Sequence, residues 1–277
     1  MKNTLTPLVI SLFCIQAAYG QFSIHLDGGY GFAPPNQEVG SFSDRTQGFN
    51  GFGYVFGSYG KGVQAGLRLG YHWNYLLGVE LGAYFQQHEL RSYSLNDTVF
   101  VQTVDRSTSQ ILLTPTLVFG RSDEGLRPFG RVGLVIPLNT SLTEDLYLEN
   151  DFTNQGGTFN VSRREYEHEV SRNMGALASL GLCYRKGMLS ITAEAYWQSL
   201  TLRPLSRTMV SYTVNDEDFL EQIPTVLREQ VFVDEIREDS NGFGLNTDPD
   251  QPGTQLVFAL PYSTVGLRLG IGIMIGE

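Results

Sequence analysis

Cysteine is nearly absent from this sequence of 277 residues, which contains only Cys14 and Cys183. Once an N-terminal leader that includes Cys14 is removed, a single cysteine remains, so no disulfide can form within the chain. A zinc site with a pair of cysteine ligands is excluded for the same reason. The fold must therefore be stabilised by means other than disulfides.

Long apolar runs and positive charge are also scarce. After residue 20 no stretch of 18 apolar residues occurs, so the sequence predicts no membrane-spanning helix. The chain has 19 Lys and Arg against 29 Asp and Glu, a net charge of −10. Residues 140–170 hold seven acidic residues against two arginines, and residues 203–258 hold eleven against four. Affinity for nucleic acid is therefore not expected.

Motifs for catalysis and for cofactor binding are missing as well. The sequence has no GxSxG, phosphate-binding loop, HExxH or CxxC pattern, and the glycines of residues 266–272 precede no helix. The acidic clusters at residues 216–218 and 248–250 lack the spacing of a calcium-binding EF-hand. We therefore predict no catalytic residue, no cofactor and no metal, and we do not expect an enzyme.

The first residues have the pattern of a secretory signal peptide. Lys2 precedes a short apolar stretch at residues 8–15, and a small-x-small cleavage site follows at residues 18–20. The apolar stretch is too short to span ~30 Å of hydrocarbon, which takes about 20 residues. We expect residues 1–20 to be a cleaved signal peptide and residues 21–277 to form one domain.

Strict alternation of apolar and polar residues is the strongest positive signal. In residues 263–275, Leu267, Leu269 and neighbouring apolar side chains share one face, whereas glycines and Arg268 share the other. This pattern predicts a strand with lipid on one side and a narrow polar space on the other. Eight such stretches occur, at residues 22–32, 62–73, 76–87, 109–120, 128–138, 172–185, 189–199 and 263–275. Only in residues 109–120 do Leu112 and Val118 interrupt the polar face.

The connections between these stretches alternate in length. Short turns occur at residues 74–75, 121–127 and 186–188, and long segments separate the other strands. Such sorting is typical of an outer-membrane β-barrel whose long loops lie outside the cell. Aromatic residues near the strand ends, such as Tyr71 and Trp73 on one side and Tyr30 and Phe32 on the other, predict the two interfacial girdles.

The long segments contain alternating residues of their own. Residues 93–100 and the turn at residues 154–157 predict hairpins that project beyond the membrane. Residues 210–214 and 230–236 also alternate. They predict either one more exposed hairpin or a ninth and a tenth strand of the barrel wall.

Charged residues also fall on the inward faces of the strands. They are Asp27, Arg68, Glu80, Arg131, Glu194 and Arg268. Because an eight-stranded barrel is just wide enough for side chains to fill it, three acids and three arginines at similar depth predict a balanced ring of ion pairs across the lumen. His25, Tyr84, Tyr196 and Gln198 are expected to assist. A gated ion path, or a catalytic cluster around His25, is the alternative interpretation of this layer.

With the strands assigned, the chain resembles the outer-membrane β-barrel domain proteins common in Bacteroidetes, the porin-T-like group, and the small barrels of the OmpA and OmpX type. The resemblance rests on residues 22–32 with Asp27-Gly28-Gly29, and on residues 113–117, 127–133 and 266–272. It implies membrane lipids, lipopolysaccharide and the barrel-assembly machinery as partners. Such barrels usually end in an aromatic residue that this machinery recognises, whereas this sequence ends Ile275-Gly276-Glu277.

The sequence therefore predicts an all-β, eight-stranded antiparallel transmembrane barrel with long extracellular hairpin loops, located in the outer membrane of a Gram-negative bacterium. We expect a plugged polar lumen and a structural or surface-interaction role, in which the acidic loops meet an extracellular protein or ligand. A narrow, porin-like, cation-preferring channel is the first alternative. A membrane-embedded lipid-modifying enzyme that uses His25 or another polar residue tilted outward is the second.

Overall fold

The computed structural model describes residues 20–276 except for 35–36, 45–50, 75, 97–99, 121–123, 152, 154–157 and 243–246. Residues 1–19 of the expected signal peptide and the expected turn at residues 154–157 lie outside the described residues. Among the helices of the described part, none has both the length and the apolar character that crossing a membrane requires.

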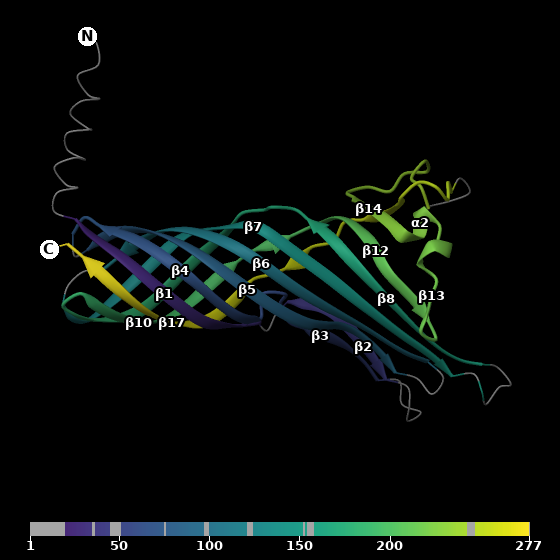
Figure 1. Ribbon diagram of the computed structural model, residues 1–277, viewed down its shortest axis with the longest axis horizontal. Coiled ribbons are helices and arrows are strands. Elements are labelled where there is room, and N and C mark those ends of the chain that lie inside the picture. The colour runs from purple at the N-terminus through teal and green to yellow at the C-terminus, as the bar shows by residue number, and fades with distance from the viewer. Residues whose placement is uncertain are drawn as a thin grey trace, which may run out of the picture.

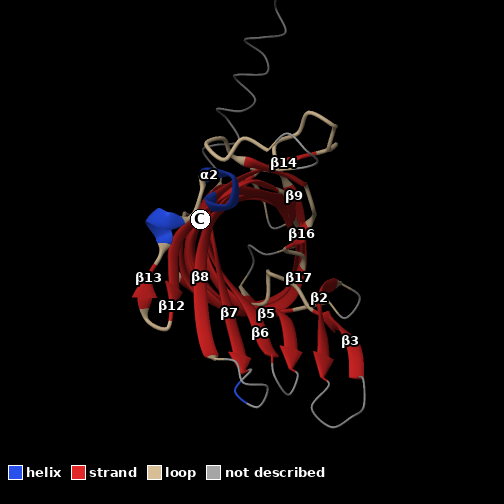
Figure 2. Cartoon of the chain, turned by 90° about the vertical axis from the view of Figure 1, so that its right-hand side faces the viewer, coloured by secondary structure: helices blue, strands red, loops and turns tan. Residues whose placement is uncertain are grey.

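Eight antiparallel strands close into a barrel (Figures 1 and 2). They are β1 (Gln21–Phe32), β4 (Gly62–His72), β5 (Leu77–Asn96), β6 (Phe100–Phe119), β7 (Gly125–Asp151), β9 (Gly175–Lys186), β10 (Leu189–Ser199) and β17 (Thr264–Ile275). Each strand pairs with the next in this order, and β17 pairs with β1 to close the wall. The prediction of eight wall strands is confirmed for all eight stretches.

The wall has an apolar outer face and a polar inner face, because successive residues of a strand point to opposite sides. In β17, Leu267 and Leu269 are 60% and 66% exposed, whereas Arg268 between them is 3% exposed. Exposed apolar side chains of this kind occur on all eight wall strands. Such a continuous apolar surface is the band that faces hydrocarbon in an outer-membrane barrel.

Glycines on the inner face make room for large polar side chains of the neighbouring strand. A Cβ atom at Gly270 would collide with the carboxylate of Asp27, and one at Gly272 would collide with the His25 ring. These glycines of β17 lie directly opposite those two residues of β1 in the register. The alternating glycines of residues 266–272 therefore serve the packing of the lumen.

Aromatic side chains gather at both ends of the wall. Rings of Phe22 and Tyr71 lie 4.9 Å apart, and Trp73 follows 5.9 Å from Tyr71, at the end that carries the short turns. At the opposite end the rings of Tyr30 and Phe32 lie 5.1 Å apart. The chain also ends at the short-turn side, as Figure 1 shows. We call the two ends the short-turn end and the long-loop end.

At the long-loop end, β5, β6 and β7 continue past the barrel as an open sheet (Figures 1 and 2). On one side the sheet continues through β8 (Phe159–Val170), β12 (Pro204–Val214), β14 (Glu229–Val233) and β15 (Gly253–Leu256). On the other side it continues through β2 (Glu38–Asp44) and β3 (Gly51–Phe56). Two pairs in it are parallel, β14 with β15 and β2 with β5. We give the name extension sheet to the parts of β5, β6 and β7 beyond the barrel together with the strands that continue from them, β2, β3, β8, β12, β14 and β15.

Short elements complete the long-loop end. They are β11 (Thr201–Leu202), β13 (Glu217–Asp218), the 3-10 helix η2 (Leu220–Gln222), α2 (Thr225–Arg228) and β16 (Leu260–Pro261). The segments considered as a ninth and a tenth wall strand lie in β12 and β14, which pair with each other and not with the wall. The exposed-hairpin interpretation is therefore correct, and the wall has eight strands.

Candidate functional site

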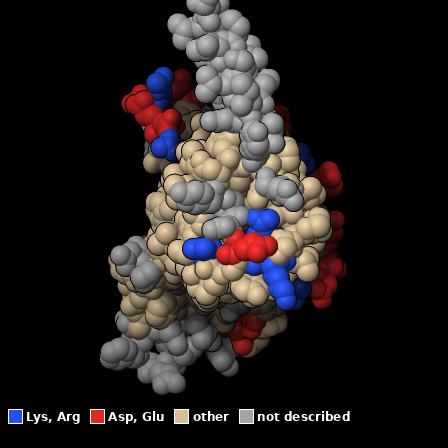
Figure 3. Space-filling model, turned by 90° about the vertical axis from the view of Figure 1, so that its left-hand side faces the viewer, with Lys and Arg blue, Asp and Glu red and all other residues tan. Residues whose placement is uncertain are grey.

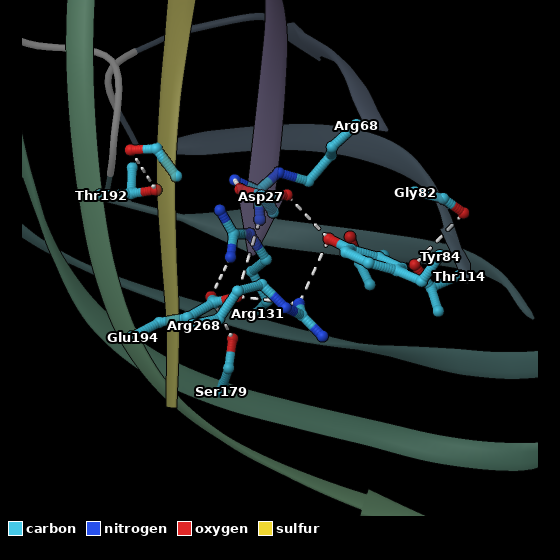
Figure 4. Close-up of polar contacts among 12 residues, drawn as sticks. Asp27, Arg68, Gly82, Tyr84, Thr114, Arg131, Ser179, Thr192, Glu194 and Arg268 are labelled. Atoms are coloured by element: carbon cyan, nitrogen blue, oxygen red, sulfur yellow. Dashed lines mark hydrogen bonds and ion pairs between the residues drawn. The ribbon is translucent and has the colours of Figure 1, made fainter. Parts of the chain in front are cut away.

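The structure brings all six inward-facing charged residues into one network. Figure 4 labels Asp27, Arg68, Arg131, Glu194 and Arg268 of this network. Arg68 of β4 contacts Asp27 of β1 with Nη2 to Oδ1 at 2.9 Å, and Glu80 of β5 with Nε to Oε2 at 3.2 Å. Glu80 in turn forms an ion pair with Arg131 of β7, with Nε to Oε2 at 2.7 Å. Arg131 also pairs with Glu194 of β10. Four consecutive ion pairs thus cross from β1 to β10 through the lumen.

Tyr84 closes this network into a ring (Figure 4). Arg268 Nη1 contacts Glu194 Oε1 at 2.9 Å and also donates to the Tyr84 hydroxyl at 3.2 Å. The Tyr84 hydroxyl donates to Asp27 Oδ2 at 3.0 Å, which returns to the first member. Three arginines face three carboxylates, so the charged ring carries no formal net charge, as buried ion pairs require.

Aromatic faces hold the guanidinium groups in place. Arg268 lies 4.1 Å from the ring centroid of Tyr84 and 4.6 Å from that of Tyr196, and Arg131 lies 4.4 Å from Phe129. Cation–π contacts of desolvated arginines contribute to stability beyond their ion pairs. His25, which the sequence analysis also expected to support the charged ring, is fully buried inside the wall.

A group of four glutamines lies toward the long-loop end, and the sequence analysis expected only one of them to support the charged ring. Gln86 Nε2 donates to Gln64 Oε1 at 3.0 Å and to Gln198 Oε1 at 3.4 Å, and Gln110 Nε2 donates to Gln86 Oε1 at 3.1 Å. Arg268 Nη2 donates to Gln64 Oε1 at 3.3 Å and so connects the glutamines to the charged ring. All four are buried. Of these four, the sequence analysis had named Gln198 alone.

An apolar cluster, which the sequence analysis also missed, fills the long-loop end of the lumen. We call it the apolar cap; its members are Tyr59, Leu112, Val135, Leu142, Leu177, Tyr196, Leu200, Leu202, Leu260 and Tyr262. Leu112 is the residue that interrupts the polar face of β6, and its inward position is explained by this packing. The sequence does contain one indication of this cluster, namely the apolar residues around positions 200–202 and 260–262, which lie outside the wall strands.

Three chain segments form the cap by bonding to one another. The Tyr59 amide donates to the carbonyl of Pro261 at 2.9 Å, and the Tyr262 amide donates to the carbonyl of Leu200 at 2.9 Å. Strand β11 pairs with β16 in a separate two-stranded sheet. Because each segment precedes or follows a wall strand at the long-loop end, the cap is anchored on several sides of the mouth.

The short-turn end is polar. Figure 3 shows basic and acidic side chains together in the middle of this face. Arg185 Nη1 donates to Gln21 Oε1 at 2.8 Å and its Nε donates to the carbonyl of Gly187 at 2.9 Å, which ties β9 to β1. Behind them His72 lies 3.8 Å from Glu80. Polar side chains therefore continue from the charged ring to this end.

A second charged cluster lies in the extension sheet, outside the barrel wall. Glu144 of β7, 3% exposed, accepts Arg106 Nε at 2.6 Å and Arg207 Nη1 at 3.3 Å. His168 of β8 lies 3.8 Å from the same carboxylate and stacks on Phe232 at 6.3 Å. Burial lowers the pKa of His168 to about 4; Glu144 opposes this shift, and the two arginines reinforce it. No sequence motif had marked this cluster.

Metal binding finds no support in the side-chain geometry. Within the described ranges, no three His, Cys, Asp or Glu side chains come together as a possible metal site. Cys183, which is buried, faces the lumen beside Thr192 in the register of β9 with β10.

Comparison with known proteins gives a family. Residues 5–183 match the model of the outer membrane protein beta-barrel domain. Two solved structures are similar: OprG from Pseudomonas aeruginosa, and Ail, the attachment invasion locus protein of Yersinia pestis, in complex with the heparin analogue sucrose octasulfate. No curated protein matches the sequence.

OprG has a TM-score of 0.41 and 14% identity, over 94% of this chain and 98% of that one. Ail has a TM-score of 0.33 and 12% identity, over 93% of this chain and 99% of that one. Neither likeness is close enough to carry a ligand or a function over to this chain. The family match, in contrast, covers more than half of the sequence, including β1 and the wall strands through β7. The chain therefore belongs to the outer membrane protein beta-barrel domain family, and its place is the bacterial outer membrane.

Proposed function

We propose that this protein is a sealed outer-membrane barrel that acts through its long-loop end at the cell surface and does not transport solutes through its lumen. The observation that carries the proposal is the filled interior: a closed charged ring, a bonded group of glutamines and an apolar cap. The expected plugged lumen agrees with this filling.

The charged ring opposes the passage of ions. A permeating ion would have to displace ion pairs whose members are nearly without solvent contact, and breaking such a pair costs about 3–5 kcal/mol. The ring is neutral overall, so it attracts neither cations nor anions by net charge. A cation-preferring channel is the alternative function, and the conductance measurement described below distinguishes it from a sealed barrel.

The extension sheet is the surface that we expect to meet a partner. It contains most of the described residues of the two acidic stretches, 140–170 and 203–258, and it projects past the wall at the long-loop end (Figure 1). Short turns of outer-membrane barrels face the periplasm, so the long-loop end, which carries the extension sheet, faces the outside of the cell. An extracellular protein or ligand is the partner of this surface in our proposal, and lipopolysaccharide surrounds the barrel below it.

A catalytic role has little support. The residue considered for lipid modification, His25, is fully buried inside the wall and does not reach the lipid face. We infer that the protein is not an enzyme. We also infer that residues 1–20 are removed on export, that the barrel-assembly machinery inserts the mature chain, and that the chain is of the porin-T-like kind common in Bacteroidetes.

Single-channel conductance of the refolded mature protein in a planar bilayer tests the proposal. A heat-dependent gel shift confirms that the barrel has folded. We expect silence from the natural protein. The double variant with Glu80→Ala and Arg131→Ala removes two members of the charged ring together. Its conductance, compared with that of the natural protein, measures how much current leaks when the ring is incomplete. Steady, cation-selective steps from the natural protein would overturn the sealed barrel and put the channel first.

The surface role has a test of its own. A protease added to intact cells should cut the exposed acidic segment of residues 234–242, which lies at the outer edge of the extension sheet. Resistance of this segment in intact cells, together with cleavage in the purified barrel, would remove the basis for a surface partner while leaving the conductance result untouched.

A further inference from the structure

We propose that the extension sheet carries a binding site for a small organic carboxylate, centred on Arg106 and resting on the apolar cap. The site goes beyond the sealed barrel, since it assigns a ligand class to a defined cavity. It depends on the long-loop end being folded as described and not on whether the lumen conducts.

A cavity of about 360 Å³ lies beside Arg106. Its lining residues are Glu38, Val39, Gly40, Tyr59, Arg106, Phe258, Ala259, Leu260 and Pro261. Pockets for small molecules start at roughly 300 Å³ and combine apolar walls with a few polar groups that fix orientation. This cavity has that size, and its lining combines the charged groups of Arg106 and Glu38 with aromatic and aliphatic side chains, the polar atoms contributing more of its surface than the apolar ones.

The floor of the cavity is closed. Tyr59 and Leu260 belong to the apolar cap, in which both are nearly inaccessible to solvent. The Tyr59 amide bonds to Pro261, another lining residue. A molecule that enters from outside therefore meets the cap and has no path into the lumen. The cavity is a dead end, which suits binding and not passage.

Arg106 is held rigidly and retains a free donor. Its Nε contacts Glu144 at 2.6 Å and its Nη1 donates to the Tyr59 hydroxyl at 2.5 Å. The rings of Tyr59 and Phe258 flank the guanidinium, each with its centroid 5.7 Å away. Among the described residues, none accepts a hydrogen bond from its Nη2 group. A fixed guanidinium with an unused edge is suited to a carboxylate.

The local charge favours an anion. Arg106 and Arg207 share the single carboxylate of Glu144, and His168 beside it is neutral at pH 7. Arg106, Arg207 and Glu144 taken alone therefore carry one net positive charge, which the exposed carboxylate of Glu38 faces from the cavity lining without an ion pair to Arg106. This positive charge stands out in a part of the chain that is otherwise acidic. A bound carboxylate would neutralise this charge in a partly desolvated setting, where ion pairs are stronger than in water.

Glu38 modifies the expected affinity. It is an exposed lining residue of the same cavity and forms no ion pair with Arg106 within the described part of the chain. Its carboxylate opposes an anion bound to Arg106. Replacing Glu38 by glutamine should therefore tighten binding, a change opposite in sign to that of any variant that damages the cavity.

The cavity walls indicate the remainder of the ligand. Phe258, which is 37% exposed, supplies the accessible aromatic wall and Pro261 adds aliphatic surface, whereas Tyr59 and Leu260 are buried in the apolar cap. A carboxylate attached to a planar apolar body matches these walls. Benzoate is the simplest probe of this class, and benzamide has the same shape without the charge.

Calorimetric titration of the refolded protein in detergent micelles tests the proposal, with benzoate as the probe and ionic strength held constant. We expect saturable binding of benzoate, and at least about tenfold weaker binding of benzamide, because a charge-assisted bond is replaced by a neutral one. Absence of saturable heat up to about 20 mM benzoate, near the weak limit of measurable affinity, would overturn the site.

Variants separate the site from general charge effects. Arg106→Gln should weaken benzoate binding about tenfold or more, whereas Arg203→Gln removes an equal charge from an exposed arginine just before β12 and should leave binding within about twofold. Glu38→Gln should tighten binding, and Phe258→Ala should weaken it with the charges intact. Equal binding by Arg106→Gln and the natural protein, both folded by gel shift, would overturn the proposal.

Should Arg106→Gln fail to fold, the opposite shifts of Glu38→Gln and Phe258→Ala still decide the question. Unchanged affinity in both of these variants would contradict the site. A protein that binds no benzoate and yet stays silent in the bilayer would refute the carboxylate site alone. A protein that binds benzoate and also conducts ions through the bilayer would refute the sealed lumen alone.

Discussion

Glu194 and Arg268 are direct partners in the register of β10 with β17, and their side chains meet with Oε1 and Nη1 2.9 Å apart. The same carboxylate also pairs with Arg131 of β7 and accepts the Ser179 hydroxyl of β9 at 3.0 Å. Arg68 Nη1 of β4 also lies 3.7 Å from Glu194 Oε1, so one acidic side chain links five wall strands. Since β17 also closes the barrel against β1, this residue couples lumen packing to closure of the wall.

Replacing this carboxylate should destabilise the barrel strongly. In Glu194→Gln, three arginines of the ring would face two carboxylates, and breaking a buried pair from one side costs about 3–5 kcal/mol. We expect a loss of that order in the free energy of unfolding, measured by urea titration of the refolded protein in micelles. A loss below about 1 kcal/mol would show that the ring is solvated.

The matched control is Glu165→Gln on β8. Glu165 is exposed on the outer face of the extension sheet, so the same chemical change there should shift stability by less than about 0.5 kcal/mol. The double variant Glu194→Gln with Arg268→Gln should lose less than the sum of the two single changes, because the second removes a charge that the first left unpaired.

Cys183 reports on access to the lumen. It is 1% exposed, faces inward, and is the only cysteine that remains once the leader with Cys14 is removed. We expect a charged maleimide to leave Cys183 unmodified in the folded barrel and to react fully after unfolding in urea, as measured by mass spectrometry. The positive control is Ser240→Cys, in the outer segment near Arg237, which should react in the folded state. Rapid reaction of folded Cys183 would mean that solvent enters from the short-turn end.

The wall of this fold could be predicted from the sequence because its signal is local. Alternation with period two is imposed by lipid on one side and a crowded lumen on the other, so each strand is visible without knowledge of its neighbours. The six charges of the ring are visible for the same reason, since each lies alone on an otherwise small or polar face. Because the interior of an eight-stranded barrel is just wide enough for side chains to fill, these inward-facing charges contact one another.

The apolar cap and the extension sheet could not be predicted in the same way. The cap joins three short segments that are far apart in sequence and have no periodicity of their own, such as Leu200–Leu202 and Leu260–Tyr262. The Glu144 cluster depends on which strands of the extension sheet pair, β7 with β8 and β8 with β12. Register in that sheet is set by long-range pairing, including two irregularities in β12.

Gly60 tests the apolar cap. A Cβ atom there would collide with the carbonyl oxygen of Tyr262, a backbone atom that cannot rotate away. Overpacking of this kind costs about 1–3 kcal/mol, so Gly60→Val should lower the temperature at which the heat-dependent gel shift occurs. Gly28→Val is the control, because Gly28 points outward and its Cβ would meet nothing within 4 Å. Equal transition temperatures for the two variants would argue against a packed cap.

His168 makes the extension sheet sensitive to acid. Burial lowers the pKa of His168 to about 4, below its ordinary value near 6.5, so the unfolded chain binds a proton in this range that the folded sheet does not. The stability contributed by the neutral, buried ring is therefore complete above about pH 6.5 and declines as the pH falls toward 4, by at most about 1.4 kcal/mol per pH unit. His168→Phe keeps the stacking on Phe232 and removes the proton site. Hydrogen exchange of β8 amides at pH 7 and pH 4.5, corrected for intrinsic rates, should show a larger loss of protection in the natural protein than in this variant. The other titrating groups are common to both proteins, so an equal loss would show that His168 is not the source of the acid sensitivity.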